Sequence, residues 1–228
     1  MFVVTADQVG SRDHADIAGP ARDRLNRDYG EHLVLPADRT AGDEIQVLTD
    51  HAATVLSIIL ELTRSHEWSV GLGCGTIRHP LPAATREASG DAFFAARDAI
   101  DRAKKQHTRF AVETHRGVGV GASDRASDGA NVEDDRGTPW PAAADAEALI
   151  NLLLEIREAR SAAGWEVYDL TSTGITQNEA ATRLGITAPS VSSRAKAAGL
   201  KIERASIESL TRLLQNLDRT STRMDPRA

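Results

Sequence analysis

Residues 174–194 read GITQNEAATRLGITAPSVSSR and carry the densest structural signal in the chain. Thr176 is followed three residues later by Glu179, a capping-box pattern that predicts the start of a helix. Gly185 suits the left-handed conformation in which such a helix ends. The TAP sequence of residues 187–189 fits the cap and first turn of a second helix, where proline is tolerated. The stretch therefore predicts two short helices joined by a tight turn, a helix-turn-helix.

Val191 and Ala195 of the second helix would pack inward. Its outward face would then carry short polar side chains and basic ones. Residues 183–204 hold five basic residues and one acidic residue, in a chain whose net charge is -6. Such a face suits the major groove of DNA, where hydroxyl groups meet base edges or phosphates and arginine reaches guanine or phosphate. The candidate DNA-binding residues are Thr176, Gln177, Thr187, Ser190, Ser192, Ser193, Arg194, Lys196 and Lys201.

The segment TQNEAATRLGITAPSVSSRAKAAGL resembles the helix-turn-helix of winged-helix bacterial regulators of the MarR type. The resemblance implies a transcription regulator that binds double-stranded DNA. The alternative is a small trihelical domain used for protein contact or dimerisation, because no β-hairpin wing is evident after Lys201-Ile202.

A helix expected from Ser206 onward carries an apolar seam of Ile207, Leu210, Leu214 and Leu217. This seam suits half of a homodimer interface, as regulators with two-fold symmetry read paired half-sites. Packing against a helix predicted over residues 147–160 of the same chain is the other interpretation. A homodimer is expected, with its contact surface left open.

The composition of the chain limits the classes of protein to which it can belong. The chain has 228 residues, 41% hydrophobic and 26% charged, which is typical of a globular protein. Residues 1–145 carry a net charge of -7 and residues 146–228 one of +1, so a polybasic binder of nucleic acid is excluded. A single cysteine, Cys74, indicates a reducing cytoplasm. No apolar run is long enough for a membrane span, and the N-terminus lacks the basic region of a signal peptide. We therefore expect a cytoplasmic protein with no membrane contact.

Residues 1–115 alternate strand-like and helix-like segments, which predicts an α+β domain close to a ferredoxin-like arrangement. Gly, Ala, Ser and Asp dominate the stretch that follows, which predicts a flexible acidic linker over residues 116–145. Residues 146–220 are predicted to form an all-α helix-turn-helix domain. In the first domain the order is β-α-β-β-α-β-α-β.

A second resemblance lies in this first domain. Asp7 ends the first strand, residues 41–45 (AGDEI) form a hairpin, and a glycine-rich strand is followed by the helix AARDAIDRAKK of residues 95–105. This order is similar to that of the GGDEF (diguanylate cyclase) domain. The SatD-like family is a nearer match, through DQVGSR at residues 7–12 and Gly-Asp-Glu at residues 42–44. The resemblance covers about residues 1–113.

The resemblance implies a nucleotide site with a divalent metal such as Mg²⁺. Asp7, Asp43 and Glu44 would be its metal ligands. Gly42 would let a nucleotide approach the backbone, and Lys104, with Arg109 nearby, would meet phosphates.

The departures from the cyclase pattern favour a nucleotide- or metal-binding sensor, and we assign no catalytic residue. Ala41 replaces the first glycine of GGDEF, and counterparts of the base-reading Asn and Asp are missing. The alternative is an active nucleotidyl cyclase in which the helix-turn-helix is an assembly module. A purely structural dimerisation domain is also open, because Gly-Asp-Glu is a common hairpin. The seven histidines show no metal-ligand spacing along the chain.

Overall fold

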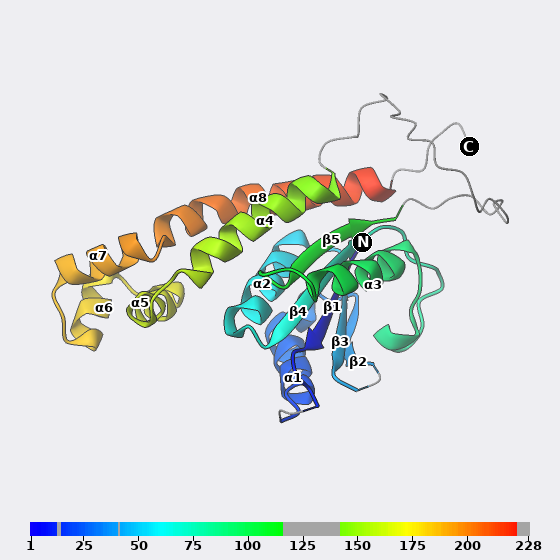
Figure 1. Cartoon of the computed structure of the whole chain (residues 1–228), viewed down its shortest axis with the longest axis horizontal. Helices are drawn as coiled ribbons and strands as arrows, with labels where there is room; N and C mark the ends of the chain where they lie inside the picture. Colours follow the sequence, from blue (N-terminus) through cyan, green and yellow to red (C-terminus); the bar gives the residue numbers. More distant parts are fainter. Residues whose placement is uncertain (13–14, 41, 116–141, 223–228) are drawn as a thin grey trace.

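The structure is a computed structural model that describes residues 1–12, 15–40, 42–115 and 142–222 (Figure 1). Five strands form one sheet: β1 (Phe2–Gln8), β2 (Leu35–Arg39), β3 (Glu44–Thr49), β4 (Trp68–Cys74) and β5 (Phe110–Thr114). Three helices alternate with them along the chain: α1 (Ala18–Tyr29), α2 (Ala52–Leu62) and α3 (Asp91–Ala103). Five helices follow: α4 (Ala143–Glu158), α5 (Ala162–Ser172), α6 (Gln177–Leu184), α7 (Ala188–Ala197) and α8 (Leu200–Thr222). The α+β class and the predicted order of elements in residues 1–115 are thereby confirmed.

The sheet is mixed, with strand order β2-β3-β1-β4-β5. β1 lies at the centre and runs antiparallel to both β3 and β4, while β2 is antiparallel to β3. β5 is parallel to β4 at the far edge. Asp7 at the end of β1 pairs directly with Glu44 on one side and with Ser69 on the other. Directly opposed residues place their side chains on the same face of a sheet, so these three polar residues share one face.

One face of the sheet is covered by α3, which lies across β4, β5 and β1. The helix comes very close because β4 presents glycines to it. A Cβ built on Gly73 would lie 2.1 Å from the carbonyl oxygen of Ala92, and one on Gly71 would lie 2.4 Å from the amide nitrogen of Ile100. The glycine-rich character of this strand therefore has a packing reason. The short 3-10 turn Thr85–Glu87, which precedes α3, contacts β2 and β3.

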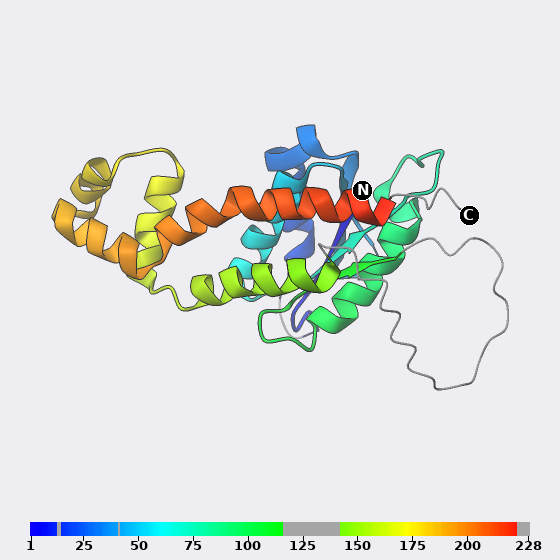
Figure 2. The same ribbon diagram turned by 90° about the horizontal axis from the view of Figure 1, so that it is seen from above.

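Four helices share the opposite face. α1 contacts β2 and β3, α2 contacts β1, β3 and β4, α8 contacts β4, and α4 contacts β5. α4 and α8 lie side by side in both views (Figures 1 and 2). The main hydrophobic core combines Phe2, Leu56 and Leu72 of the first part of the chain with Ile150 and Leu214 of the last part. The core therefore continues across the predicted boundary between residues 1–115 and 146–220.

The apolar seam of α8 is buried within the chain. Leu210, Leu214 and Leu217 are 5%, 0% and 1% exposed and belong to the main core, and Ile207 packs against it. Of the two interpretations of this seam, packing within one chain is the one observed. α8 contacts α4 there, as that interpretation expected, and also α2.

A second, smaller core holds α5, α6 and α7 together at the end of the molecule away from the sheet (Figures 1 and 2). Val167 of α5, Ala180 and Ala181 of α6, and Val191 and Ala195 of α7 are its buried members. The inward packing predicted for Val191 and Ala195 is confirmed. α8 has 23 residues, a length of about 35 Å. It runs from this trihelical unit back to the sheet.

Most of the predicted acidic linker, residues 116–141, lies outside the described residues. No helix in the described ranges is long and apolar enough to cross a membrane.

Candidate nucleic-acid interface and nucleotide site

The two helices of the predicted helix-turn-helix begin as the sequence indicates. The Thr176 hydroxyl accepts from the backbone N–H of Glu179, and the Glu179 carboxylate accepts from the backbone N–H of Thr176 at 2.7 Å. These bonds to the charged form hold the pKa of Glu179 below its ordinary value. Thr187 caps α7 by accepting from the N–H of Ser190, and its hydroxyl lies 2.9 Å from the Ser190 hydroxyl.

The turn between α6 and α7 depends on Gly185. Its φ of +64° lies in the left-handed region, which a residue with a Cβ adopts only at a cost. The N–H of Gly185 donates to carbonyl groups in the last turn of α6. The turn places α7 in contact with α6. The arrangement of two short helices around a tight turn is thus present as geometry, and a third helix, α5, completes the unit.

α7 presents its polar side outward. Of the predicted DNA-binding residues, eight are exposed: Thr176, Gln177, Thr187, Ser190, Ser192, Ser193, Lys196 and Lys201. Pro189 is also exposed, whereas Val191 and Ala195 face the small core. The unit lies at the far end of the molecule from the sheet (Figure 1).

Arg194 is the exception, because it is only half-exposed and has a partner. Its Nη1 lies 3.3 Å from Oε2 of Glu166 on α5. Both side chains are solvent-accessible, and such pairs contribute only about 0–1 kcal/mol. Arg194 can therefore exchange Glu166 for a phosphate or a base edge at little cost.

The one acidic residue of the basic window is removed from the surface. Glu203 is 4% exposed and forms ion pairs with Arg157 and Arg160, both also buried. The remaining charged residues of this window, Arg183, Arg194, Lys196, Lys201 and Arg204, are all cations. Within this window the charges at the surface are therefore all positive, and Glu166 of α5 pairs with one of them, Arg194.

The predicted nucleotide and metal residues collect at one end of the sheet, on the face that carries α3. Asp7 and Glu44 are cross-strand neighbours, which places their Cβ atoms about 5 Å apart. Lys104 reaches Asp7 from the end of α3, with Nζ 3.1 Å from Oδ1. Arg109 donates to the Ser69 hydroxyl at 3.2 Å, on the strand beside Asp7.

The hairpin residues contribute less to this cluster. Gly42 has a φ of +86° and is exposed, and its carbonyl accepts from Arg39. The backbone carbonyl of Asp43 accepts from the N–H of Gln8 at 3.2 Å. The Glu44 carboxylate accepts from the Thr40 hydroxyl at 2.8 Å and from the Gln46 amide at 3.1 Å.

A three-carboxylate metal site is not formed by these residues. In the described part of the chain, Asp7, Asp43 and Glu44 do not bring one ligand atom each within 4.8 Å of the others. Asp7 and Glu44 alone remain adjacent. Two carboxylates suit a Mg²⁺ ion that takes its other ligands from water and from the phosphates of a nucleotide.

An open cleft of about 540 Å³ adjoins Glu44, between β3 and the N-terminal half of α3. It is lined by Thr40, Glu44, Gln46, Arg86, Ala88, Ser89, Phe93, Phe94 and Arg97. Phe94 is 51% exposed, and Arg97 forms no ion pair within the described ranges. Sequence reasoning missed these residues. Arg86 and Phe94 lie far from the Gly-Asp-Glu turn along the chain, and no sequence motif marks them.

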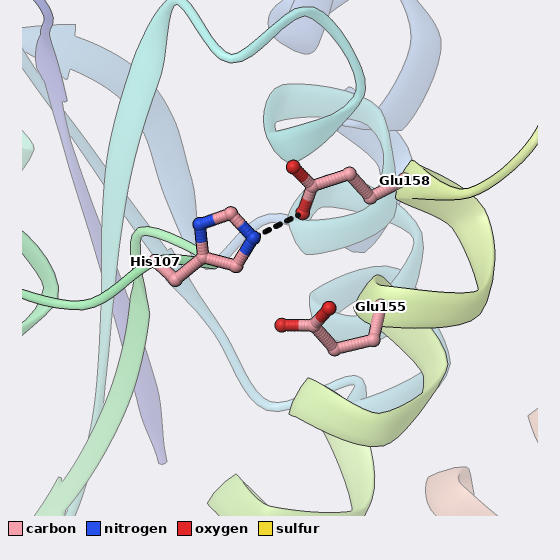
Figure 3. Close-up of side chains that lie close together, drawn as sticks. All are labelled: His107, Glu155 and Glu158. Atoms are coloured by element: carbon pink, nitrogen blue, oxygen red, sulfur yellow. Dashed lines mark ion pairs between the residues drawn. The ribbon is translucent and has the colours of Figure 1, made fainter.

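A different set of side chains comes close enough to share a metal ion. His107, Glu155 and Glu158 place one ligand atom each within 4.8 Å of one another, and His107 Nε2 lies 3.2 Å from Glu158 Oε2 (Figure 3). The two glutamates are one helical turn apart on α4, and the histidine comes from the segment between α3 and β5. All three are exposed. One nitrogen and two carboxylate ligands suit zinc or manganese more than Mg²⁺.

Comparisons with protein-family models, with curated proteins and with solved structures found no significant match. The functional assignment therefore depends on the residues of this chain and their geometry.

Proposed function

We propose that this protein is a sequence-specific transcription regulator that binds double-stranded DNA through α6 and α7. The observation that carries the proposal is the capped α6–Gly185–α7 unit, whose exposed face is polar and basic in an otherwise acidic chain. Ser190, Ser192 and Ser193 are short enough to let α7 approach base edges. Lys196 and Lys201, with Arg194 released from Glu166, supply phosphate contacts.

The fold of the unit differs in one respect from the winged-helix regulators that the sequence resembles. After α7 the described chain continues directly into α8, with no strand up to residue 222. The proposal therefore assigns all DNA contacts to the trihelical unit and its flanking basic residues, without a wing. Reading of paired half-sites would require a homodimer, which we retain as part of the proposal.

The decisive experiment is selection of sheared genomic DNA by the purified protein at moderate salt, followed by sequencing. We expect one enriched motif with two-fold symmetry, and Arg194→Ala should weaken binding to it about tenfold while leaving the thermal midpoint unchanged. Arg212→Ala is the matched control, because Arg212 is equally cationic but lies on the sheet-proximal part of α8. Glu166→Ala should leave binding unchanged or strengthen it. No enrichment above background would refute DNA reading and leave an assembly role for the unit.

We also propose a nucleotide-sensing role for the first part of the chain. Its first four strands have the order β2-β3-β1-β4 with all neighbours antiparallel, and α1 and α2 lie on one face. This is the connectivity expected of a ferredoxin-like, cyclase-like frame. Support for a ligand comes from the adjacency of Asp7, Glu44 and Lys104, and from the neighbouring cleft with Arg97 and the exposed Phe94.

Thermal denaturation with ATP, GTP, CTP or UTP, each with and without Mg²⁺, tests this role. One of the four is expected to raise the thermal midpoint only when Mg²⁺ is present, because a ligand of the native state stabilises it. The double variant Asp7→Ala, Glu44→Ala should lose that response, whereas Asp98→Ala on the outer side of α3 should keep it. No response of the wild-type protein to any of the four would sink the sensing role. Turnover of the nucleotide would instead favour the cyclase alternative.

A further inference from the structure

A second cleft, unrelated to the Asp7 end of the sheet, lies where the sheet-bound helices meet the trihelical unit. Its volume is about 610 Å³, within the range of small-molecule sites. Tyr29, Leu60 and Glu61 line it from α1 and α2, and Tyr168 and Ile207 line it from α5 and α8. The cleft is thus shared between the part of the molecule that holds the main core and the part proposed to bind DNA.

The acidic residues of this cleft are already neutralised. Glu61 accepts from Arg24 and from the Tyr29 hydroxyl, the latter at 2.9 Å. Burial and the adjacent Glu61 carboxylate raise the pKa of Tyr29, so its hydroxyl stays protonated and donates. Glu203 is bound by Arg157 and Arg160 together. No carboxylate that lines the cleft is left without a cation.

The cations of the cleft are in excess. Arg64 is balanced by Asp169, through two bonds of 2.7 and 2.8 Å. Arg157, which lines the cleft, shares the single charge of Glu203 with Arg160, which does not line it. Arg160 Nη1 is buried with no hydrogen-bond partner. Arg204 lines the cleft, is exposed, and forms no hydrogen bond or ion pair within the described residues. The lining itself holds three arginines and two glutamates, a net charge of +1, and Arg204 is its cation without a partner among the described residues.

The rest of the wall is apolar or aromatic. Leu60, Leu200 and Ile207 supply aliphatic surface, and the ring of Tyr168 lies at the same junction. We propose that this cleft binds a small organic anion with an aromatic or aliphatic body, whose acidic group pairs with Arg204. Its body rests on the apolar wall, where burial contributes to affinity.

Such a ligand would also affect the position of the trihelical unit. It touches α1 and α2 on one side and α5 and α8 on the other, so it favours one placement of α5–α7 relative to the sheet. A ligand shifts an equilibrium only through different affinity for its two states. This regulatory consequence rests on the proposed DNA-binding function, whereas the binding site itself does not.

The test uses the whole protein and 8-anilinonaphthalene-1-sulfonate, a fluorescent aromatic anion, in the absence of DNA. N-phenyl-1-naphthylamine is the matched neutral probe, because it has the same ring system without the sulfonate. We expect saturable binding of one sulfonate probe per chain, at least tenfold tighter than that of the neutral probe. Arg204→Glu should weaken it at least tenfold, and Arg212→Glu, elsewhere on α8, should leave it unchanged.

A second variant tests the location of the binding site by steric block, without a change of charge. Ser57 is an exposed residue of α2 that lines the cleft, so Ser57→Trp should fill it and block both probes without disturbing the core. Unchanged affinity for the sulfonate in Arg204→Glu, or equal affinity for the two probes, would overturn the proposal. Absence of saturable binding to the wild-type protein would overturn it as well. Because no DNA is present, these outcomes are separate from failure of the proposed function.

Discussion

Asp7 and Lys104, two residues predicted to bind a ligand, form an ion pair with each other. Similarity to cyclase-like domains implies that one holds a metal and the other a phosphate. In the structure they bind each other at 3.1 Å, with side chains 22% and 42% exposed. A partly exposed pair of this kind contributes at most about 1 kcal/mol, so a nucleotide with its metal could displace it. The pair is therefore compatible with the proposed nucleotide site.

Glu179 offers a test of the capping box through pH. Its folded-state pKa lies below the ordinary value because Thr176 donates to the carboxylate. A lowered pKa means that the contribution to stability is present above the unfolded pKa and is lost as pH falls through the folded value. The difference in thermal midpoint between wild type and Glu179→Ala should be positive at pH 7 and shrink below about pH 4. A difference that stays constant from pH 7 to pH 3 would contradict the charged cap.

At the scale of elements, α3 packs very closely against β4. The helix backbone sits directly over Gly71 and Gly73, with small side chains such as Ala92 and Ala96 below it. A helix can approach a strand this closely only where neither side carries bulk. This close approach explains the glycines of β4, which lack the G-x-G-x-x-G spacing of a dinucleotide-binding motif.

Gly73→Ala should therefore destabilise the protein strongly. The added methyl would lie 2.1 Å and 2.3 Å from backbone atoms of Ala92 and Ala96, which cannot rotate away as a side chain can. We expect a loss of about 3 kcal/mol or more in the free energy of unfolding, measured by urea denaturation. Gly174→Ala is an informative comparison, because its site has open space and only the cost of a positive φ applies. Equal, small losses at the two positions would contradict the close helix–strand contact.

α8 joins the two cores, and its seam gives a second prediction at this scale. Leu214 is fully buried in the main core. Leu214→Ala should lower the free energy of unfolding by about 2–5 kcal/mol through lost packing and a cavity. Sedimentation should show the same oligomeric state as the wild type, because the seam is used within the chain. A variant of normal stability that loses a dimer would return the seam to an intermolecular role.

At the scale of the whole molecule, three buried charged residues mark the place where the trihelical unit leaves the sheet. Arg157 near the end of α4 and Arg160, just after that helix, enclose Glu203 of α8. Arg157 also donates to the carbonyl of Leu60 in α2 at 2.9 Å. Trp165 of α5 stacks against both arginines, with ring centroids 4.9 and 4.3 Å from their guanidinium carbons. The cluster therefore ties α2, α4, α5 and α8 together at one point.

Removing its only anion should be costly. Glu203→Ala would leave two buried guanidinium groups without a counter-charge, which typically costs about 3–5 kcal/mol in the free energy of unfolding. Glu208→Ala, an exposed position on the same helix, should change the stability by less than about 1 kcal/mol. The measurement is urea denaturation of both variants beside the wild type. A near-neutral Glu203→Ala would show that the cluster does not hold the junction.

Local signals allowed much of this molecule to be predicted. The order of elements in residues 1–115 follows from alternating apolar periods, and the caps at Thr176 and Thr187 follow from side-chain chemistry that acts within one turn. The burial of Val191 and Ala195 follows from helical spacing. The clefts could not be predicted in this way. Their walls combine residues such as Tyr29, Tyr168 and Arg204, which are far apart in the chain and show no shared motif.

By itself, the sequence determined the elements, the α6–Gly185–α7 turn and the basic character of α7, because these depend on neighbours within a few residues. Only the tertiary structure decided that α8 closes the main core rather than a dimer, and that Glu203 is withdrawn from the basic surface. It also decided that Asp7 is held by Lys104. The amphipathic pattern of a helix predicts which face is buried but not which surface covers it. The partner of a charged residue depends on which residues the folded chain brings close to it.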